Sequence, residues 1–432
     1  MRIATAAAVA LLPLVASWTF PDNLQHALNP HSTEDKLSNV ISSSPVLTLH
    51  RALCEVSSVT GNENAVGHLL VSFLEAHNFT VVKQSVGNYS DGRFNLYAVP
   101  DASKFSGHKD ASSGGSDIFQ SRPKVILSSH IDTVPPHFNY SLSAPKHGSR
   151  KDILISGRGT VDDKACVATQ IAAVFSLLSN PDLNISPADL ALLFVVGEET
   201  TGDGMKSFSN SDLYEATSKD LRAVLFGEPT ELKLAAGHKG ILMLRVYAHG
   251  KAAHSGYPWL GRSANSMILP ALMVLDKLGD IPPRKGGLPR SKKFGRSTVN
   301  VGRIEGGVAA NVVPEYAHAE VAFRLAGGTP DEVRRIVRNA ISGADPEGLL
   351  ELEFQQGYAP VVLDAGVDGF EEITVNYGTD VPNLEVGKGV KRYLYGPGSI
   401  LVAHGANEGL TVGDMEEAVE GYERLVKHVL KL

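Results

Sequence analysis

In the first half of this chain, short apolar runs alternate with helical patterns, and few folds accommodate that alternation. Apolar runs bounded by turn residues at 94–99, 125–128, 190–196 and 223–226 indicate buried strands. Residues 164–178, which lie between them, are apolar at helical spacing and rich in small residues. The pattern predicts an α/β fold in which helices sandwich a mixed, mostly parallel sheet.

A different pattern begins after residue 237. Segments 241–248 and 315–325 alternate apolar and polar residues, which indicates a sheet with one covered face. The same region contains two helical patterns, at 263–278 and 330–341, and one further strand at 350–354. Thr329 is placed to cap the second of these helices. We therefore predict an inserted α+β lid or dimerisation domain of residues 238–357, within a catalytic domain formed by 18–237 and 358–432 and ending in a helix at 415–431.

The N-terminus has the pattern of a secretory signal peptide. Met1 and Arg2 precede an apolar run and the small residues Ala16 and Ser17, so we place the signal in residues 1–17. A buried N-terminal helix is the alternative. Four N-glycosylation sequons agree with secretion, although each triplet also arises by chance: Asn78, Asn88, Asn139 and Asn184. We expect an extracellular protein with no membrane attachment once the signal is cleaved.

The composition is that of a globular protein, and its charge argues against one class of partner. The chain has 432 residues, 43% of them hydrophobic and 20% charged, as in soluble globular proteins. A net charge of -7 argues against a nucleic-acid partner, which usually selects a basic face. Cys54 and Cys166 are the two cysteines. An oxidising compartment would permit one disulfide between them, and two buried free thiols are the alternative.

Acidic and imidazole side chains follow the predicted strands at the points where the strands end. They are His130 and Asp132, Asp162 and Asp163, Glu198 and Glu199, Glu228, and His404 after the apolar run 400–402. In open α/β sheets the functional crevice lies at the carboxyl ends of the strands, so we expect these groups to converge on one edge.

Imidazole and carboxylate ligands together suit zinc, with cobalt or manganese as alternatives. The five candidate ligands are too many for one catalytic zinc, which usually takes three protein ligands: His130, Asp162, Glu199, Glu228 and His404. They suit two ions that share a bridging carboxylate. Asp132 can fix the tautomer of His130, and Glu198 is the natural general base.

Each group also has an ordinary structural interpretation. A histidine after a strand is often a surface or capping residue, and the Glu198–Glu199 pair could be a solvated turn. Asp162 and Asp163 could cap a helix. Gly157-Arg158-Gly159 lacks the spacing of a phosphate-binding loop. The metal hypothesis depends on all the groups occurring together.

Five ordered motifs resemble those of the zinc aminoacylase, carboxypeptidase and deacetylase family. They are SHIDTVPP at 129–136, GRGTVDDK at 157–164, GEET at 197–200, GEPT at 227–230, and His404. The resemblance covers residues 45–432. It implies that His130 and Glu228 bind one zinc ion, that Glu199 and His404 bind the other, that Asp162 bridges them, and that Glu198 is the base. Gly405 departs from the Thr or Ser that the family often has there.

The resemblance extends to the second domain and to one backbone detail. GKAAHSG at 250–256 is similar to a lid segment whose histidine, here His254, reaches a catalytic site, often across a dimer, and could stabilise an oxyanion. The segments with Asn311 and Arg324 resemble those that bind the substrate carboxylate. A local hydrogen bond at His254 and a solvated strand arginine are the alternatives. A cis peptide bond between Asp162 and Asp163 is also implied.

The function that we predict is hydrolysis of an amide bond next to a free carboxylate. Secretion favours a carboxypeptidase acting on small peptides, and an N-acyl-amino-acid deacylase, like an aminoacylase or acetylornithine deacetylase, is the alternative. A metal-free binding protein on the same scaffold is a remote third candidate, because such a protein would be expected to lose a ligand or the base. A homodimer through the lid domain is a further expectation.

Overall fold

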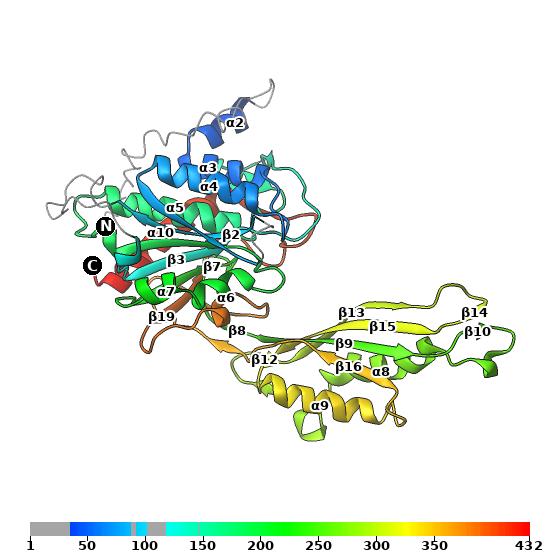
Figure 1. The fold of residues 1–432 in the computed structure, drawn as a ribbon. Helices are drawn as coiled ribbons and strands as arrows, with labels where there is room; N and C mark the ends of the chain where they lie inside the picture. Colours follow the sequence, from blue (N-terminus) through cyan, green and yellow to red (C-terminus); the bar gives the residue numbers. More distant parts are fainter. Residues whose placement is uncertain (1–34, 88–91, 102–117, 146) are drawn as a thin grey trace, which may run out of the picture. The chain divides into compact units, whose positions relative to one another are not determined.

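The computed structural model describes residues 35–87, 92–101, 118–145 and 147–432, in two compact units (Figure 1). The first unit comprises the chain up to Leu234 with Ala365–Glu371 and Asn383–Leu432. The second comprises Ala235–Asp364 and Glu372–Pro382, so it takes in segments beyond residue 357 that the sequence pattern assigns to the first domain. The predicted signal peptide and the sequon at Asn88 lie outside the described residues.

The first unit is built on a six-stranded sheet in the order β1-β2-β6-β3-β7-β19. Strands β6, β3, β7 and β19 run parallel, and β1 and β2 are antiparallel additions at one edge. The bounds are β1 Phe79–Ser85, β2 Phe94–Pro100, β3 Val125–His130, β6 Leu190–Val195, β7 Ala223–Gly227 and β19 Lys391–Tyr395. Strands β2, β3, β6 and β7 are buried throughout, as strands covered on both faces must be. The predicted mixed, mostly parallel sheet is confirmed.

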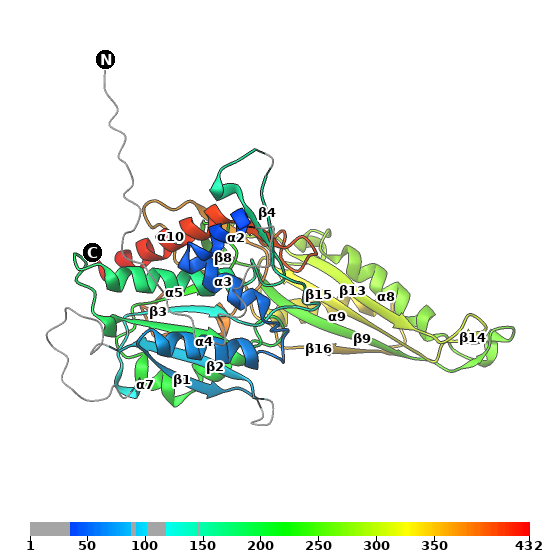
Figure 2. The ribbon, with the colours of Figure 1, turned by 90° about the horizontal axis from the view of Figure 1, so that it is seen from above.

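Helices cover both faces of this sheet. Helix α4, Asn64–Ala76, packs on β1 and β2, and α5, Lys164–Ser179, packs on β3. Helices α3, Pro45–Glu55, and α10, Val412–Leu430, lie against α5 (Figure 2). Because α5 is enclosed by the sheet and these two helices, it is apolar on nearly every side. The short helices α6, Asp203–Ser209, and α7, Asp212–Thr217, lie on the other side of the sheet in Figure 1, and α2, Asp35–Ser42, precedes α3.

A small antiparallel sheet lies beside the loops of the candidate site. Its strands are β4 Ser141–Ser143, β5 Leu154–Ser156 and β20 Gly409–Thr411, in the order β20-β5-β4. Strand β5 leads into the Gly-rich loop before α5, and β20 leads into α10, whose first turn is capped by Thr411. The Gly-rich loop therefore begins at this small sheet, and the loop that carries His404 ends at it.

The second unit contains a four-stranded antiparallel sheet in the order β13-β15-β9-β16. Its strands are β9 Gly240–His249, β13 Thr298–Gly306, β15 Tyr316–Leu325 and β16 Leu350–Phe354. Buried and partly exposed residues alternate along β9 and β15, and helices α8, Ala264–Leu278, and α9, Pro330–Ser342, complete the core on one face. Thr329 caps α9 through a bond from the amide of Glu332, as its sequence predicts.

Shorter strands complete the second unit. Strands β17 Val361–Val362 and β18 Glu372–Val375 flank β8, Leu234–His238, where the chain passes between the units. Two antiparallel pairs are formed, one by β10 Ala253–His254 with β14 Val312–Val313, which is distant in sequence, and one by the hairpin of β11 Arg290–Ser291 with β12 Gly295–Arg296. Cys54 and Cys166 are both free and buried, which is the second of the two alternatives. Among the described residues, no helix combines the length and the apolar character that crossing a membrane requires.

Candidate metal centre

The register of the parallel strands brings their carboxyl ends to one level. His130, the last residue of β3, lies opposite Val195, the last residue of β6. Ser128 lies opposite Phe226 of β7, so Glu228, two residues further on, follows at the level of His130. The ends of β3, β6 and β7 therefore present His130, Glu198 with Glu199, and Glu228 along the same edge, as the sequence predicts.

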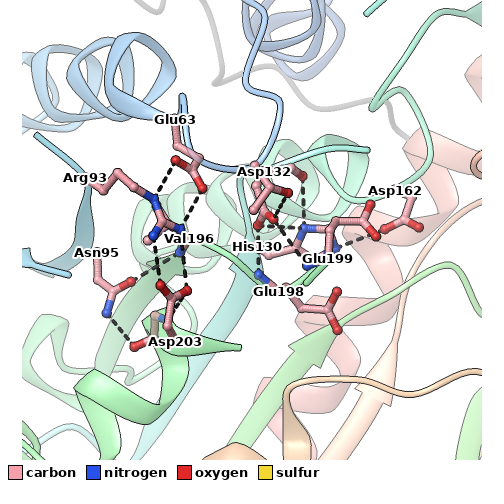
Figure 3. Close-up of polar contacts among 12 residues, drawn as sticks. Glu63, Arg93, Asn95, His130, Asp132, Asp162, Val196, Glu198, Glu199 and Asp203 are labelled. Carbon is pink, nitrogen blue, oxygen red and sulfur yellow. Dashed lines mark hydrogen bonds and ion pairs between the residues drawn. The ribbon is translucent and has the colours of Figure 1, made fainter. Parts of the chain in front are cut away.

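Asp162 lies between the two histidines. Its Oδ1 is 3.0 Å from Nε2 of His130, and its Oδ2 is 3.2 Å from Nε2 of His404. The same His404 nitrogen is 3.0 Å from Oε2 of Glu199. Figure 3 shows the carboxylates of Asp162 and Glu199 close together beside His130. The structure thus brings residues from four distant parts of the sequence to one point.

The five predicted ligands form two overlapping groups of three. His130, Asp162 and Glu228 offer ligand atoms within 4.8 Å of one another, and so do Asp162, Glu199 and His404. Each group supplies one imidazole and two carboxylates, all of them zinc-binding side chains, and three is the number of protein ligands that an open catalytic zinc site uses. Asp162 is the member that both groups share. The donor set therefore fits two cations with one bridging carboxylate.

The electrostatics of this edge favour cations. Burial, followed by the charges of Glu198 and Asp162, raises the pKa of Glu228 well above its usual value. Burial likewise raises the pKa of Asp163 to about 7. Hydrogen bonds to Asp162 and Glu199 raise the pKa of His404 to about 10. More carboxylates than imidazoles are held in a partly dry site, and a bound cation would relieve their repulsion.

Asp132 faces the ring nitrogen of His130 that points away from Asp162, and it has further partners. Its Oδ1 is 3.5 Å from Nδ1 of His130, and its own backbone carbonyl oxygen lies 3.1 Å from the same nitrogen. The carboxylate also accepts the backbone amides of Glu198 at 3.1 Å and Glu199 at 3.2 Å, and the hydroxyl of Thr60 at 2.7 Å. Asp132 therefore holds the loop of the predicted base as well as facing the histidine.

The loop of His404 also differs from expectation. The apolar run 400–402 forms turns, not a strand, and Leu401 is 86% exposed. Strand β19 ends earlier, at Tyr395, so a longer loop carries His404, whose φ is 63°. The peptide bond between Asp162 and Asp163 is cis, as the resemblance implies.

A buried ion pair that sequence reasoning missed joins the two ligand loops. Glu408 accepts the backbone amides of Val161 at 3.1 Å and Asp162 at 3.2 Å, and it pairs with Arg158. Arg158 also donates to the carbonyl oxygen of His404 at 3.3 Å. Both side chains are almost fully buried. Their pairing links the loop of Asp162 to the loop of His404.

In the second unit, His254 and Asn311 lie together. His254 is paired with Val312 between β10 and β14, and Ser255 donates its amide to the carbonyl of Asn311 at 3.0 Å. Nδ1 of His254 accepts the amide of Gly256 at 3.0 Å. Because that nitrogen is an acceptor, a neutral His254 carries its proton on Nε2, where it can be donated.

The structure does not bring Arg324 to Asn311 within one chain. Strand β15 begins at Tyr316, soon after Asn311 and β14, and Arg324 lies eight residues along it, opposite Ile241. At about 3.4 Å per residue, Arg324 is roughly 27 Å from Tyr316, the end of the strand that follows Asn311. The two residues therefore cannot bind one small carboxylate within a single chain.

Comparisons with known proteins identify relatives of this chain and a family match for part of its second unit. The family description of a peptidase dimerisation domain matches residues 236–348. A probable carboxypeptidase of Neosartorya fischeri is 53% identical over 408 residues, which cover 92% of this chain and 89% of the relative. A probable carboxypeptidase of Aspergillus niger is 53% identical over 398 residues, covering 90% and 91%.

Two solved structures share the fold. A tripeptidase from Staphylococcus aureus superposes with a TM-score of 0.67 at 20% identity, covering 91% of this chain and 100% of that one. An M20 family metallo-carboxypeptidase from Sulfolobus solfataricus gives a TM-score of 0.62 at 17% identity, covering 90% and 100%. At these identities the likeness is one of fold.

Proposed function

This chain belongs to the M20 peptidase family, and from that premise we propose that it is a secreted carboxypeptidase with two zinc ions in one site. That it is a peptidase follows from its relatives. The two overlapping groups of ligands that share Asp162 are the observation that supports the two-metal site. His130 and Glu228 would hold one ion, and Glu199 and His404 the other.

The chemistry of the proposed reaction divides between the ions and the side chains. Bound zinc ions would supply electrophilic activation of the peptide carbonyl and of the attacking water. Glu198 accepts a proton from that water as the water oxygen forms a bond to the carbonyl carbon. Glu198 then returns the proton to the amide nitrogen as the C–N bond breaks, which releases a free amino acid and a shortened peptide. Repulsion from the charge of Glu198 is among the causes that raise the pKa of Glu228, which supports a base close to the proposed ligands.

Residues of the second unit would bind and orient the substrate. The Nε2 proton of His254 is available for the oxyanion that develops on the carbonyl oxygen. Arg324 would bind the terminal carboxylate through two parallel hydrogen bonds. Since Arg324 lies near the end of β15 that is farther from the His254–Asn311 pair, we propose that two copies of the chain contribute to each site, with His254 and Asn311 coming from the partner.

Secretion is a separate part of the proposal. It is supported by the apolar N-terminal segment and by the sequons. Asn78, Asn139 and Asn184 are exposed, as acceptors of a glycan must be. A glycosidase-induced shift in mass of the secreted protein would test this part alone.

A substrate panel tests the activity. Purified chain loaded with zinc is incubated with small peptides, with the same peptides amidated at the C-terminus, and with N-acyl amino acids. We expect stepwise release of the C-terminal residue from free peptides and little from amidated ones. Arg324→Gln should raise KM for free peptides by roughly 10²-fold, from a lost charge-assisted pair of bonds of about 3 kcal/mol. Cleavage of N-acyl amino acids alone would replace the carboxypeptidase by a deacylase.

A further inference from the structure

A second cluster of charged residues lies next to the candidate site and takes no part in the ligand set. Arg93, beside β2, donates to both carboxylate oxygens of Glu63 at 2.9 Å each. It also donates to Asp203 at 2.8 and 3.4 Å. The three side chains come from parts of the chain that are 30 and 110 residues apart. Figure 3 shows them on one side of Val196, with Glu198 and Glu199 on the other.

The cluster touches the backbone of the loop that carries the base. Gly197 has a φ of +76°, and a Cβ placed on it would lie 1.9 Å from Oδ1 of Asp203 and 2.7 Å from Nη2 of Arg93. Gly197 therefore packs directly against the ion pair, and a larger residue there would have to displace Asp203 and Arg93 and adopt a strained positive φ. The next two residues in the chain are the proposed base Glu198 and the proposed ligand Glu199.

Hydrogen bonds hold the same loop on two sides, the side of the charged cluster and the side of the candidate metal site. On the near side, Asn95 accepts the amide of Val196 at 3.2 Å and donates to the carbonyl of Gly204 at 2.7 Å. On the far side, the carboxylate of Asp132 accepts the amides of Glu198 and Glu199. These bonds fix the loop at Val196, at Glu198 and Glu199, and at its return into α6. The charged cluster packs against Gly197, which lies between the first two of these points.

We propose that Arg93, held between Glu63 and Asp203, is a positioning residue that sets Gly197 and so the direction of the Glu198 carboxylate. The inference rests on the proposed function, because it assigns Glu198 the role of base. The cluster carries one positive and two negative charges, so removing Asp203 leaves a balanced Arg93–Glu63 pair. Asp203 can therefore be replaced without leaving an unpaired buried cation.

Asp203→Ala is the test variant, and Asp189→Ala is its matched control. Asp189 pairs with Lys124 at 2.8 Å at the amino ends of β6 and β3, which is the opposite edge of the same two strands. We expect kcat to fall by roughly 10- to 100-fold in Asp203→Ala, because a displacement of about 1 Å at a catalytic group has such an effect. KM should change little, since the groups that bind substrate lie elsewhere. Asp203→Asn, which keeps an oxygen acceptor, and Arg93→Lys, which keeps the charge, should each retain more of the wild-type kcat than Asp203→Ala does.

Hydrogen exchange of the loop gives a readout that does not depend on activity. The amides of Thr201 and Gly202 donate to the carbonyl of Gly197, at 3.2 and 2.8 Å, so loosening Gly197 should expose them. We expect the peptide spanning 196–204 to exchange at least tenfold faster in Asp203→Ala than in wild type, with no such change in Asp189→Ala. Equal exchange and equal kcat in the two variants would overturn the proposal. If wild-type protein cleaved no peptide, the proposed function would fall, and the exchange data would still decide whether Asp203 holds the loop.

Discussion

Replacing Glu408 by Gln should destabilise the first unit and weaken its hold on metal. Glu408 is buried, and its carboxylate serves Arg158 and the amides of Val161 and Asp162. Glutamine keeps one oxygen for those amides but turns an NH2 group towards the buried guanidinium. Arg158 would then be left without its countercharge in a site that is almost closed to water.

The magnitude follows from the burial of the pair. Removing one partner of a buried ion pair costs about 3 to 5 kcal/mol. At about 2 °C per kcal/mol for a unit of this size, Tm should fall by roughly 6 to 10 °C. Zinc affinity should fall by roughly 10- to 100-fold, as it does when groups that orient metal ligands are lost.

Glu416→Gln is the matched control. Glu416 pairs with Arg150, and both side chains are about a third exposed, so its loss should cost less than about 1 kcal/mol. Thermal unfolding followed by circular dichroism, with and without a chelator, measures both variants. If Glu408→Gln unfolds within about 2 °C of Glu416→Gln and binds zinc as tightly as wild type, the proposed link between the two ligand loops is wrong.

Three further variants test single groups. Glu198→Gln keeps the shape of the side chain and should lower kcat by roughly 10²- to 10⁴-fold at unchanged zinc content; wild-type turnover would remove Glu198 from the mechanism. Asp163→Ala removes no ligand but takes a buried carboxylate from beside Asp162, so a chelator competition should show zinc affinity lower by roughly 10- to 100-fold, and unchanged affinity would refute this. His254→Ala should lower kcat by roughly 10²-fold or more with KM little changed, and a change in KM alone would assign His254 to binding.

The residues that sequence could place are those at the ends of parallel strands. His130, Glu199 and Glu228 each follow a buried apolar run, and the shared level of the carboxyl ends is a general property of such sheets. Asp162 and His404 do not end strands of that sheet. Both were grouped with the strand-end residues in the sequence, but Asp162 follows the Gly-rich loop after β5, and the apolar run before His404 was wrongly taken for a strand end.

The supporting ion pairs could not be predicted in the same way. Arg158 and Glu408 are 250 residues apart, and Arg93 and Asp203 are 110 apart. Neither pair has a local pattern, because any acidic side chain could serve as partner until the loops are folded. The separation of Arg324 from Asn311, by contrast, follows from the length of an extended strand and could have been worked out from the predicted element at 315–325.

Zinc stoichiometry tests the two-metal site most directly. Metal-free protein is titrated calorimetrically with zinc, as wild type and as three single variants, His130→Ala, His404→Ala and Asp162→Asn. Each histidine belongs to one group of ligands, and Asp162 belongs to both. The account predicts two zinc ions per wild-type chain, one tightly bound ion for either histidine variant, and weakened binding of both for Asp162→Asn. A single zinc ion in wild type, or two tightly bound ions in His404→Ala, would contradict it.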